Sequence, residues 1–449
     1  MKNLLKPFLA VLLILLVFSA VVARSNAAPG VAQLSTATNT PRITATAPLP
    51  TKTPYNLHST PAGNRPPQCA FPLESLGFQE SAIASPAMEN FSFSEPQVVL
   101  SSPDGISLVA WLPDNKTLLI KRRQPSSVKE TIETFNTRTR QSQIYAVQDG
   151  SSNPIWLSDL NAVAYTTSVG KSNNSSKVDR YELWISYGSL EKQRLISADV
   201  SLHSAALLGE KLMYLSPSAG VRPQIWDGTA ERAQTTPIDL ESFVYSKFPQ
   251  FPVSTPALAR NLQIASHPQG RWSAFYGSAL LFLADSETGQ VCEIDLGVEN
   301  TLPRWAYDLR WSADGRYLAM ITTSAYPGEL IKRNFINTLD VSTGAIYQSD
   351  LGSFIDTIDW VPNAPVLTAL ARTNLGDGRG TSGLFLVNVI QGQAQQALTW
   401  HLFGGTNNLA VWSPDRKSIA VDCTWRDTLP AITPADKFRI CLIQVAAQH

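Results

Sequence analysis

The chain has 449 residues, of which 16% are charged, and its 36 Lys and Arg residues balance its 36 Asp and Glu residues. A net charge of zero excludes the basic field that binding to a nucleic-acid backbone requires, so we expect no nucleic-acid partner. Hydrophobic residues make up 44% of the chain and aromatic residues 9%, which is enough for a large core and favours strands. We therefore expect a β-rich globular protein.

Residues 1–28 are predicted to be a secretory signal peptide. Lys2 and Lys6 precede the uncharged apolar run Phe8 to Val22, and small residues follow it. The run is shorter than the roughly 20 residues that a membrane-spanning helix needs. We therefore expect export to the periplasm, the cell surface or the medium, with membrane contact only if the signal is not cleaved.

Residues 29–68 are predicted to form a disordered spacer. Between Thr36 and Pro54, 11 of 19 residues are Thr or Pro. Such a composition cannot bury a core, and its prolines keep the chain extended. Composition does not distinguish a stalk from a leader without a role. Residues 69–95 are expected to form a short lead-in segment to the folded part of the chain.

A turn motif that usually begins with Trp recurs along residues 96–449. With the first residue of each copy, the motifs are WLPDNKTLLI at 111, WLSDLNAVAY at 156, LLGEKLMYL at 207, SHPQGRWSAF at 266, WSADGRYLAM at 311, WVPNAPVLTA at 360 and WSPDRKSIAV at 412. The copies start 45 to 59 residues apart, which suits four short strands and their connections. We therefore predict an all-β fold, a seven-bladed β-propeller of four-stranded blades.

Each copy of the motif is expected to join the first strand of a blade to the second. In such a turn Pro supplies a fixed φ, Asp bonds to its own backbone, and Gly or Asn adopts a positive φ. The Trp before the turn offers a large surface that can pack between neighbouring blades.

This motif resembles the WD40-like repeat of TolB-type propellers, whose consensus is similar to Trp-Ser-Pro-Asp-Gly-Lys. The resemblance covers about residues 96–449 and implies a propeller fold. The weaker copies have Gln269 and Asn363 where Asp is expected, and the shortened copy has Glu210. No single activity is implied, because similar propellers serve as binding modules, as envelope assembly factors and as the propeller halves of peptidases.

The last blade is one strand short, because only AAQH follows FRICLIQV at the end of the sequence. The segment Pro96 to Gly105, just before blade one, can supply the missing outermost strand. We therefore predict that this segment closes the ring, which also removes a free sheet edge.

Long connections are expected to gather on one face of the ring, opposite the short turns such as SADG and STG. Long loops on a rigid scaffold commonly hold binding residues, and aromatic and Arg side chains are frequent interface anchors. Alternatively, these loops are tolerated insertions whose aromatic residues cap the core. The candidate ligand-binding residues of this face are Phe243, Tyr245, Phe248, Phe251, Tyr326, Arg379, Trp425 and Arg426.

Four charged residues are expected near the central channel. Arg310 and Asp359 directly precede the Trp of blades five and six, and Asp308 and Asp356 lie nearby in the sequence. They could line a polar channel. We expect instead an ion pair between adjacent blades, because paired charges in protein interiors are often structural.

Four cysteines indicate disulfides if the protein is exported to an oxidising compartment. Cys423 ends KSIAVDC and Cys441 lies in FRICLIQV, so the two residues meet if these strands are antiparallel neighbours. We predict a Cys423–Cys441 bond, which leaves Cys69 with Cys292 by elimination. The sequence has no Cys-x-x-Cys and no His pair at metal spacing, so we expect neither a metal nor a cofactor.

The sequence therefore predicts an exported propeller that binds a protein, peptide or glycan of the cell envelope without catalysis. It contains no Gly-x-Ser-x-Gly elbow, Walker loop or His-Glu-x-x-His motif. The alternative is a propeller enzyme that acts on glycans or peptides with channel carboxylates such as Asp308, Asp356 and Asp359.

Overall fold

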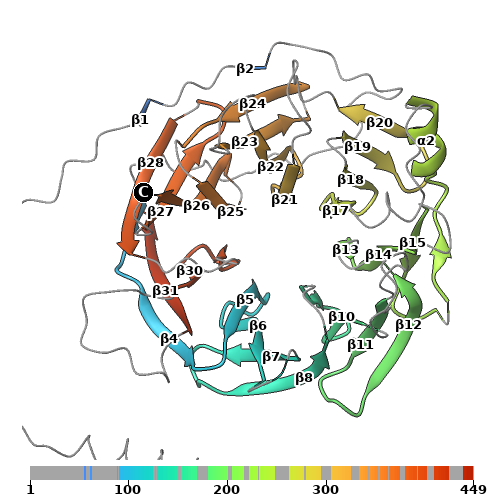
Figure 1. Ribbon diagram of the computed structural model, residues 1–449, viewed down its shortest axis with the longest axis horizontal. Helices are drawn as coiled ribbons and strands as arrows, with labels where there is room; N and C mark the ends of the chain where they lie inside the picture. Colours follow the sequence, from blue (N-terminus) through green and yellow to red (C-terminus); the bar gives the residue numbers. More distant parts are fainter. Residues whose placement is uncertain are drawn as a thin grey trace, which may run out of the picture. The chain divides into compact units, whose positions relative to one another are not determined.

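Seven antiparallel sheets stand in a ring in the computed structural model of the protein (Figure 1). All described residues belong to the second of two compact units, Lys52–His449. They are 55–56, 61–62, 88, 91–124, 127, 129–149, 153–168, 181–200, 205–216, 222–230, 232–247, 262–277, 280–294, 305–324, 333–341, 343–351, 354–362, 364–374, 380–391, 393–401, 409–423 and 438–447. The predicted seven-bladed propeller is confirmed.

Blades one to four each consist of four consecutive strands, the first of them innermost. Blade one holds β5 (Ile106–Trp111), β6 (Thr117–Arg123), β7 (Glu130–Asn136) and β8 (Ser142–Gln148). Blade two holds β9 (Ile155–Leu157), β10 (Ala162–Ser168), β11 (Tyr181–Ser186) and β12 (Gln193–Val200). Blade three holds β13 (Ala205–Leu208), β14 (Lys211–Leu215), β15 (Pro223–Trp226) and β16 (Gln234–Thr235). Blade four holds β17 (Gln263–Ser266), β18 (Trp272–Gly277), β19 (Leu280–Asp285) and β20 (Val291–Ile294).

Blades five to seven are each extended by strands from the N-terminal part of the chain. Blade five holds β21 (Trp305–Trp311), β22 (Tyr317–Ser324), β23 (Arg333–Asp340), β24 (Ala345–Ser349) and β2 (Pro61–Ala62). Blade six holds β25 (Phe354–Trp360), β26 (Val366–Asn374), β27 (Gly380–Asn388), β28 (Gln393–His401) and β1 (Tyr55–Asn56). Blade seven holds β29 (Ala410–Trp412), β30 (Ser418–Asp422), β31 (Phe438–Ala447), β3 (Phe91–Phe93) and β4 (Gln97–Ser102).

Blade seven closes the ring as predicted, because β4 pairs antiparallel with the first half of β31, with Phe438 opposite Ser102. A second strand, β3, pairs with the last residues of β31. We did not expect β3, which lies in the predicted lead-in segment. Two N-terminal strands thus cover the edge of β31, so that no length of it is left as a free edge.

Two short strands fall within the segment predicted as a spacer. Tyr55 and Asn56 pair with the outermost strand of blade six, and Pro61 and Ala62 pair with that of blade five. Each adds two residues to a sheet that already has four strands. The chain before the lead-in segment therefore contacts the propeller at two of its outer edges.

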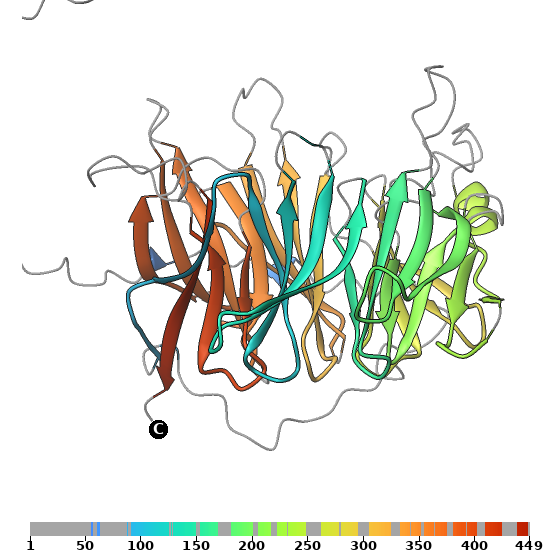
Figure 2. The ribbon, with the colours of Figure 1, turned by 90° about the horizontal axis from the view of Figure 1, so that it is seen from below.

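The repeated turn has the geometry that its residues indicate. In blade five the Asp314 carboxylate accepts hydrogen bonds from the Ser312 hydroxyl and from the backbone N–H of Arg316, and Gly315 has φ of 75°. Asp415 makes the corresponding two bonds in blade seven. These turns gather at the lower face in Figure 2, so the opposite face receives the second-to-third and blade-to-blade connections.

Arg416 takes the position of Gly315 in the turn of blade seven, with φ of 61°. Positive φ is costly for most side chains and is tolerated better by Asn, which holds this position in blade one as Asn115, with φ of 58°. Arg416→Asn is therefore expected to raise the free energy of unfolding by about 0.5–1 kcal/mol. Urea denaturation would measure this change, and an unchanged or lower midpoint would contradict it.

The recurring Trp links neighbouring blades by hydrogen bonds. In three consecutive blades the indole N–H donates to an oxygen of the preceding blade at 3.0 Å; the pairs are Trp311 with Ala265 O, Trp360 with Arg310 O, and Trp412 with Thr368 Oγ1. A buried indole needs such an acceptor. In these three blades the Trp of the motif therefore also bonds to the neighbouring blade, whereas the buried indole N–H of Trp111 in blade one has no such acceptor among the described residues.

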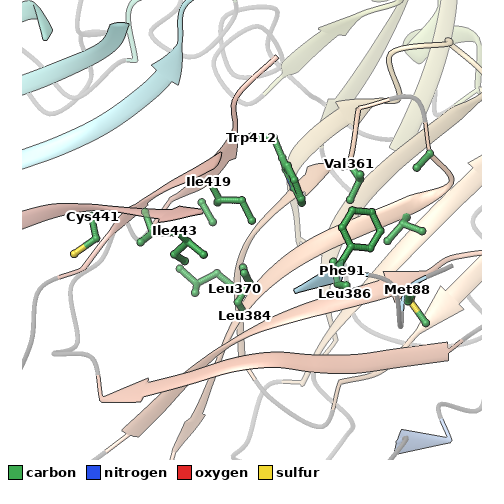
Figure 3. Packing of buried hydrophobic residues seen from close by; sticks show 14 of the residues in the cluster. Met88, Phe91, Val361, Leu370, Leu384, Leu386, Trp412, Ile419, Cys441 and Ile443 are labelled. Carbon is green, nitrogen blue, oxygen red and sulfur yellow. The ribbon is translucent and has the colours of Figure 1, made fainter. Parts of the chain in front are cut away.

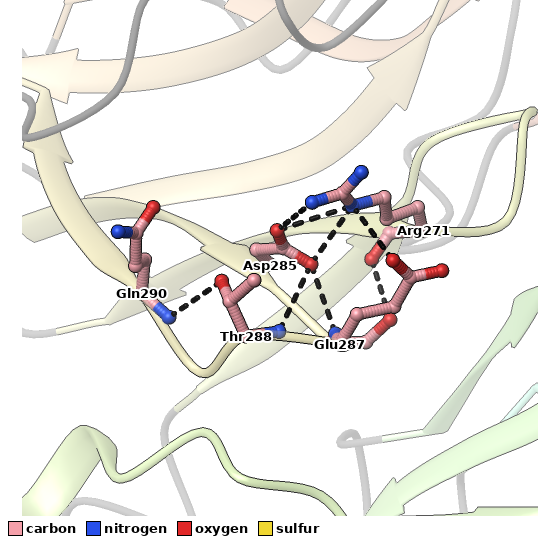
Figure 4. A network of polar contacts seen from close by, with 6 residues as sticks. Arg271, Asp285, Glu287, Thr288 and Gln290 are labelled. Atoms are coloured by element: carbon pink, nitrogen blue, oxygen red, sulfur yellow. Dashed lines mark hydrogen bonds and ion pairs between the residues drawn. The ribbon is translucent and has the colours of Figure 1, made fainter.

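An Arg after the turn ties the second strand to the end of the third. In blade four Arg271 forms an ion pair with Asp285, whose carboxylate also accepts the backbone N–H groups of Glu287 and Thr288 (Figure 4). Arg316 and Asp340 form the same pair in blade five. In these two blades the contacts join the short turns of a blade to one another on this face of the ring.

The hydrophobic core lies mainly between adjacent blades. Between blades six and seven it includes Leu370, Leu384, Leu386, Ile419, Ile443 and Trp412 (Figure 3). Phe91 of β3 is buried in the same cluster, and its ring meets that of Trp412 edge to face at 6.2 Å between centroids. The N-terminal segment is therefore part of the core, because β3 buries an aromatic side chain there.

A helix, α2 (Leu240–Lys247), begins the connection between blades three and four that we expected to be a loop. Leu240 and Val244 are buried in the core of these blades. Phe243 packs against the same core, with its ring edge to face with that of Phe282 at 5.4 Å. This contact gives Phe243 a packing role, as the alternative interpretation of the loop aromatics foresees.

The predicted Cys423–Cys441 disulfide is confirmed, with 5.7 Å between the two Cα atoms. Cys292 on β20 is also disulfide-bonded, and its expected partner, Cys69, lies outside the described residues. Disulfides persist in oxidising compartments, so they favour an exported protein. Among the described residues, no helix has the length and hydrophobicity to cross a membrane.

Candidate functional site

The four predicted charged residues lie on the innermost strands of two adjacent blades. Asp308 and Arg310 belong to β21, and Asp356 and Asp359 belong to β25. In both strands the pairing with the next strand is interrupted by a bulge, after Tyr307 in β21 and after Ile355 in β25. Bulges re-aim side chains, and here they occur beside carboxylates at the centre of the ring.

Asp308 sits at the bulge of β21 with φ of 58°, in the left-handed region. Its Oδ1 accepts the Nε–H of Arg310 at 2.8 Å. Its Oδ2 accepts the Thr357 hydroxyl and the backbone N–H of Ile358, both on β25. The unfavourable backbone conformation is thus stabilised by bonds that connect blade five to blade six.

The ion pair that we expected between adjacent blades is formed within single blades. Arg310 pairs with Asp308 on its own strand, because the bulge brings the two side chains together. The link to blade six is made by the second oxygen of Asp308. The bonds of Asp308 to Thr357 and Ile358 nevertheless agree with a structural contact between blades five and six.

Asp359 forms the same kind of link to blade seven. One carboxylate oxygen accepts the backbone N–H of Trp412 at 3.0 Å, and the other accepts that of Trp360. Burial raises the pKa of Asp359 to about 6, although the charge of Arg310 and the N–H of Trp412 favour the ionised form. This carboxyl is therefore protonated at a higher pH than an ordinary aspartate.

Asp422, which sequence reasoning missed, completes the series between blades seven and one. Its two oxygens accept the backbone N–H groups of Leu108 and Leu409. Burial raises its pKa to about 7, against these hydrogen bonds and the charge of Lys121. Three consecutive blade junctions thus use an aspartate to hold the backbone of the next blade, and we refer to Asp308, Asp359 and Asp422 as the junction carboxylates.

Asp359 and Asp422 predict how the stability of the protein depends on pH. Because the pKa values of Asp359 and Asp422 are higher in the folded than in the unfolded protein, the folded state binds more protons between about pH 4 and pH 7. The free energy of unfolding is therefore expected to fall as the pH rises from 5 to 8. Chemical denaturation at several pH values measures this slope.

Asp422→Asn tests the contribution of one junction carboxylate. The variant cannot titrate at this position, so its free energy of unfolding should change with pH less than that of the wild type, by about 2 kcal/mol between pH 5 and pH 8. Comparing the two slopes removes the contribution of all other groups. Identical slopes would mean that the carboxyl of Asp422 does not titrate in this range.

Asp356 belongs to a second cluster, at the opposite end of β25 from its short turn. Asp356 pairs with Arg372 of β26, with 2.5 Å between Oδ1 and Nη2. The guanidinium of Arg372 lies over the ring of Phe354, with 5.2 Å from Cζ to the ring centroid. We refer to Phe354, Asp356 and Arg372 as the rim cluster.

Most of the predicted loop residues lie outside the described part of the chain: Phe248, Phe251, Tyr326, Arg379, Trp425 and Arg426. Tyr245 lies in α2, but its side chain is outside the described residues. Sequence reasoning missed Phe354 and Arg372. The signal that could have found them is their facing position on two adjacent strands, which requires the register of the blade.

Within the part of the chain that the structure describes, no three His, Cys, Asp or Glu residues are grouped as metal ligands would be. The carboxylates of the innermost strands are engaged with other groups of the protein. The junction carboxylates hold the blades in register, and the inner strands present the rim cluster at their ends.

Comparison with protein-family models and with curated proteins gives no match. Solved structures with a similar fold include a putative TolB from Agrobacterium tumefaciens, at 13% identity and a TM-score of 0.37, covering 78% of this chain and 93% of that one. An oligogalacturonate lyase in complex with manganese has 10% identity and a TM-score of 0.37, covering 82% and 99%. A prolyl endopeptidase has 9% identity and a TM-score of 0.44, covering 72% and 47%.

The seven sheets define the chain as a seven-bladed β-propeller. The Trp turns of three of its blades bond to the preceding blade, in agreement with the repeat motif of the sequence. The solved structures differ in activity and are distant in sequence, so they do not decide what this propeller does.

Proposed function

We propose that the protein is an exported, non-catalytic propeller that binds a protein, peptide or glycan of the cell envelope. The binding face is the one opposite the short turns, where the longer connections join the blades. In this proposal the ring acts as a rigid scaffold, and the loops and inner rim of that face supply the contacts.

The observation that carries the proposal is that the carboxylates of the innermost strands already bond to other groups of the protein. Asp308 and Asp359 accept backbone N–H groups of the next blade, and Asp356 is paired with Arg372. A general acid or base must reach the reacting atoms of a substrate. Carboxylates that already bond to other groups of the protein suit a structural role, which leaves the exposed face as the place for function.

Export to the periplasm or the cell surface is part of the proposal. It is supported by the predicted signal peptide and by the buried Cys423–Cys441 disulfide in the closing blade. The balanced charge of the chain is consistent with a neutral ligand surface and not with a polyanion.

A cross-linked pull-down from the native cell envelope tests the binding face. The intact protein is compared with a variant in which residues 250–260 and 425–436 are replaced by short Gly-Ser linkers, so that α2 and the disulfide are kept. A partner captured by the intact protein and lost in the variant supports the proposal. Equal capture by both proteins, or by neither, counts against it.

The enzymatic alternative is favoured by one observation, the raised pKa of Asp359. Carboxyls with a pKa near 6 can act as general acids. The test is a screen of glycan and peptide substrates with the wild type and Asp359→Asn. Turnover that this substitution abolishes would replace the binding proposal by an enzymatic one.

A further inference from the structure

Phe354 differs from the other exposed hydrophobic residues that the structure describes. Six large hydrophobic side chains are exposed in these residues: Val98, Ile144, Leu190, Leu195, Phe354 and Ile390. Phe354 is the only aromatic residue of the six, with 43% of its surface exposed, and the only one on an innermost strand. Exposed aromatic side chains that are held in a fixed position are the residues that most often anchor protein interfaces.

The ring of Phe354 is held in place by its neighbours in the rim cluster. Phe354 and Arg372 are directly opposite each other on β25 and β26, so the guanidinium covers one face of the ring. Asp356, whose side chain is only 7% exposed, fixes that guanidinium. An anchor ordered before binding loses less entropy on association than a free side chain.

The backbone beside Phe354 is fixed as well. The carbonyl oxygen of Ile355 accepts the hydroxyl of Tyr307 at 2.6 Å and the side-chain N–H of Asn334 at 3.2 Å. Both donors come from blade five. The rim cluster therefore stands on a rigid junction of two blades, at the face that the short turns do not occupy.

We propose that the rim cluster anchors a protein partner that packs an apolar side chain on the open face of Phe354 and offers a hydrogen-bond acceptor to Arg372. This inference rests on the proposed function and names the site and the class of partner. The ring has no polar atom, so it complements an apolar side chain, and a sugar that stacks its C–H face on the ring is the competing outcome of the test below. Asp356 balances the charge of Arg372, which disfavours an anionic polymer.

Random peptides displayed on phage, selected against the full exported protein, are a defined probe for this partner. A consensus peptide is then synthesised and titrated against the wild type, Phe354→Ala and Arg372→Gln. Hot-spot residues cost 2 kcal/mol or more on truncation, so we expect Phe354→Ala to weaken binding about 30-fold or more. Arg372→Gln should weaken it as well, because the ring loses its support.

Ile390→Ala is the matched control, because Ile390 is equally exposed, at 41%, in blade six but lies in a short turn of the other face. It should bind as the wild type does, and thermal unfolding should show that all variants are folded. Peptides that bind Phe354→Ala as tightly as the wild type would overturn the rim anchor while leaving a binding propeller. Failure to select any peptide would contradict the proposal that the partner is a protein. Binding of envelope oligosaccharides that depends on Phe354 would contradict it as well.

Discussion

Replacing the six residues of β4 by Gly and Ser is expected to abolish the cooperative unfolding of the ring. β4 supplies the outer pairing of the first half of β31, and Val99 and Leu100 pack against the core between blades seven and one. Losing these side chains and the ladder should cost about 5 kcal/mol, a large part of the stability of an ordinary domain. Calorimetry would show a broad transition at much lower temperature, or none.

The matched control is the same replacement of residues 55–62. It removes β1 and β2, which each pair through two residues with a blade that already has four strands. The cost should stay within about 1 kcal/mol. If both replacements lowered the melting temperature equally, ring closure by β4 would not explain the lowered stability. A general effect of changing the N-terminal segment would explain it.

The blade number and the closing strand could be predicted because each blade needs the same turn. Asp within the turn makes local bonds to the turn backbone. Trp before the turn bonds to the preceding blade in blades five, six and seven. Cys423 and Cys441 could be paired because they lie near facing ends of adjacent strands, with Cys441 opposite Val421, two residues before Cys423. These features depend on contacts within one blade or between neighbouring blades.

The features that were missed depend on longer-range geometry. β1 and β2 have two residues each, too few for a hydrophobic pattern, and form only because an outer edge is available. The junction carboxylate Asp422 looks like an ordinary strand end, and its partner Leu108 is 314 residues away. The α2 helix had a usable signal, since Leu240, Phe243 and Val244 follow a helical spacing.

Gly315→Ala is expected to lower the free energy of unfolding by about 3 kcal/mol. Gly315 has φ of 75°, and a Cβ atom at this position would lie 2.3 Å from Nε2 of His267. His267 is fully buried, its ring meets that of Trp311 edge to face at 4.8 Å, and its Nε2 lies 3.0 Å from the carbonyl oxygen of Gly315. The added methyl group must therefore displace an aromatic contact between blades four and five.

Gly209→Ala separates the two causes of this loss. Gly209 occupies the corresponding turn of blade three with φ of 62°, but a Cβ atom there would meet its nearest neighbour, the Cα of Gly270, at an ordinary 3.6 Å. This variant should lose only the cost of the backbone conformation, about 1 kcal/mol. Urea denaturation of both variants measures the difference, which is the cost of moving His267. Equal losses would mean that His267 moves freely, and that the junction of blades four and five does not depend on its position.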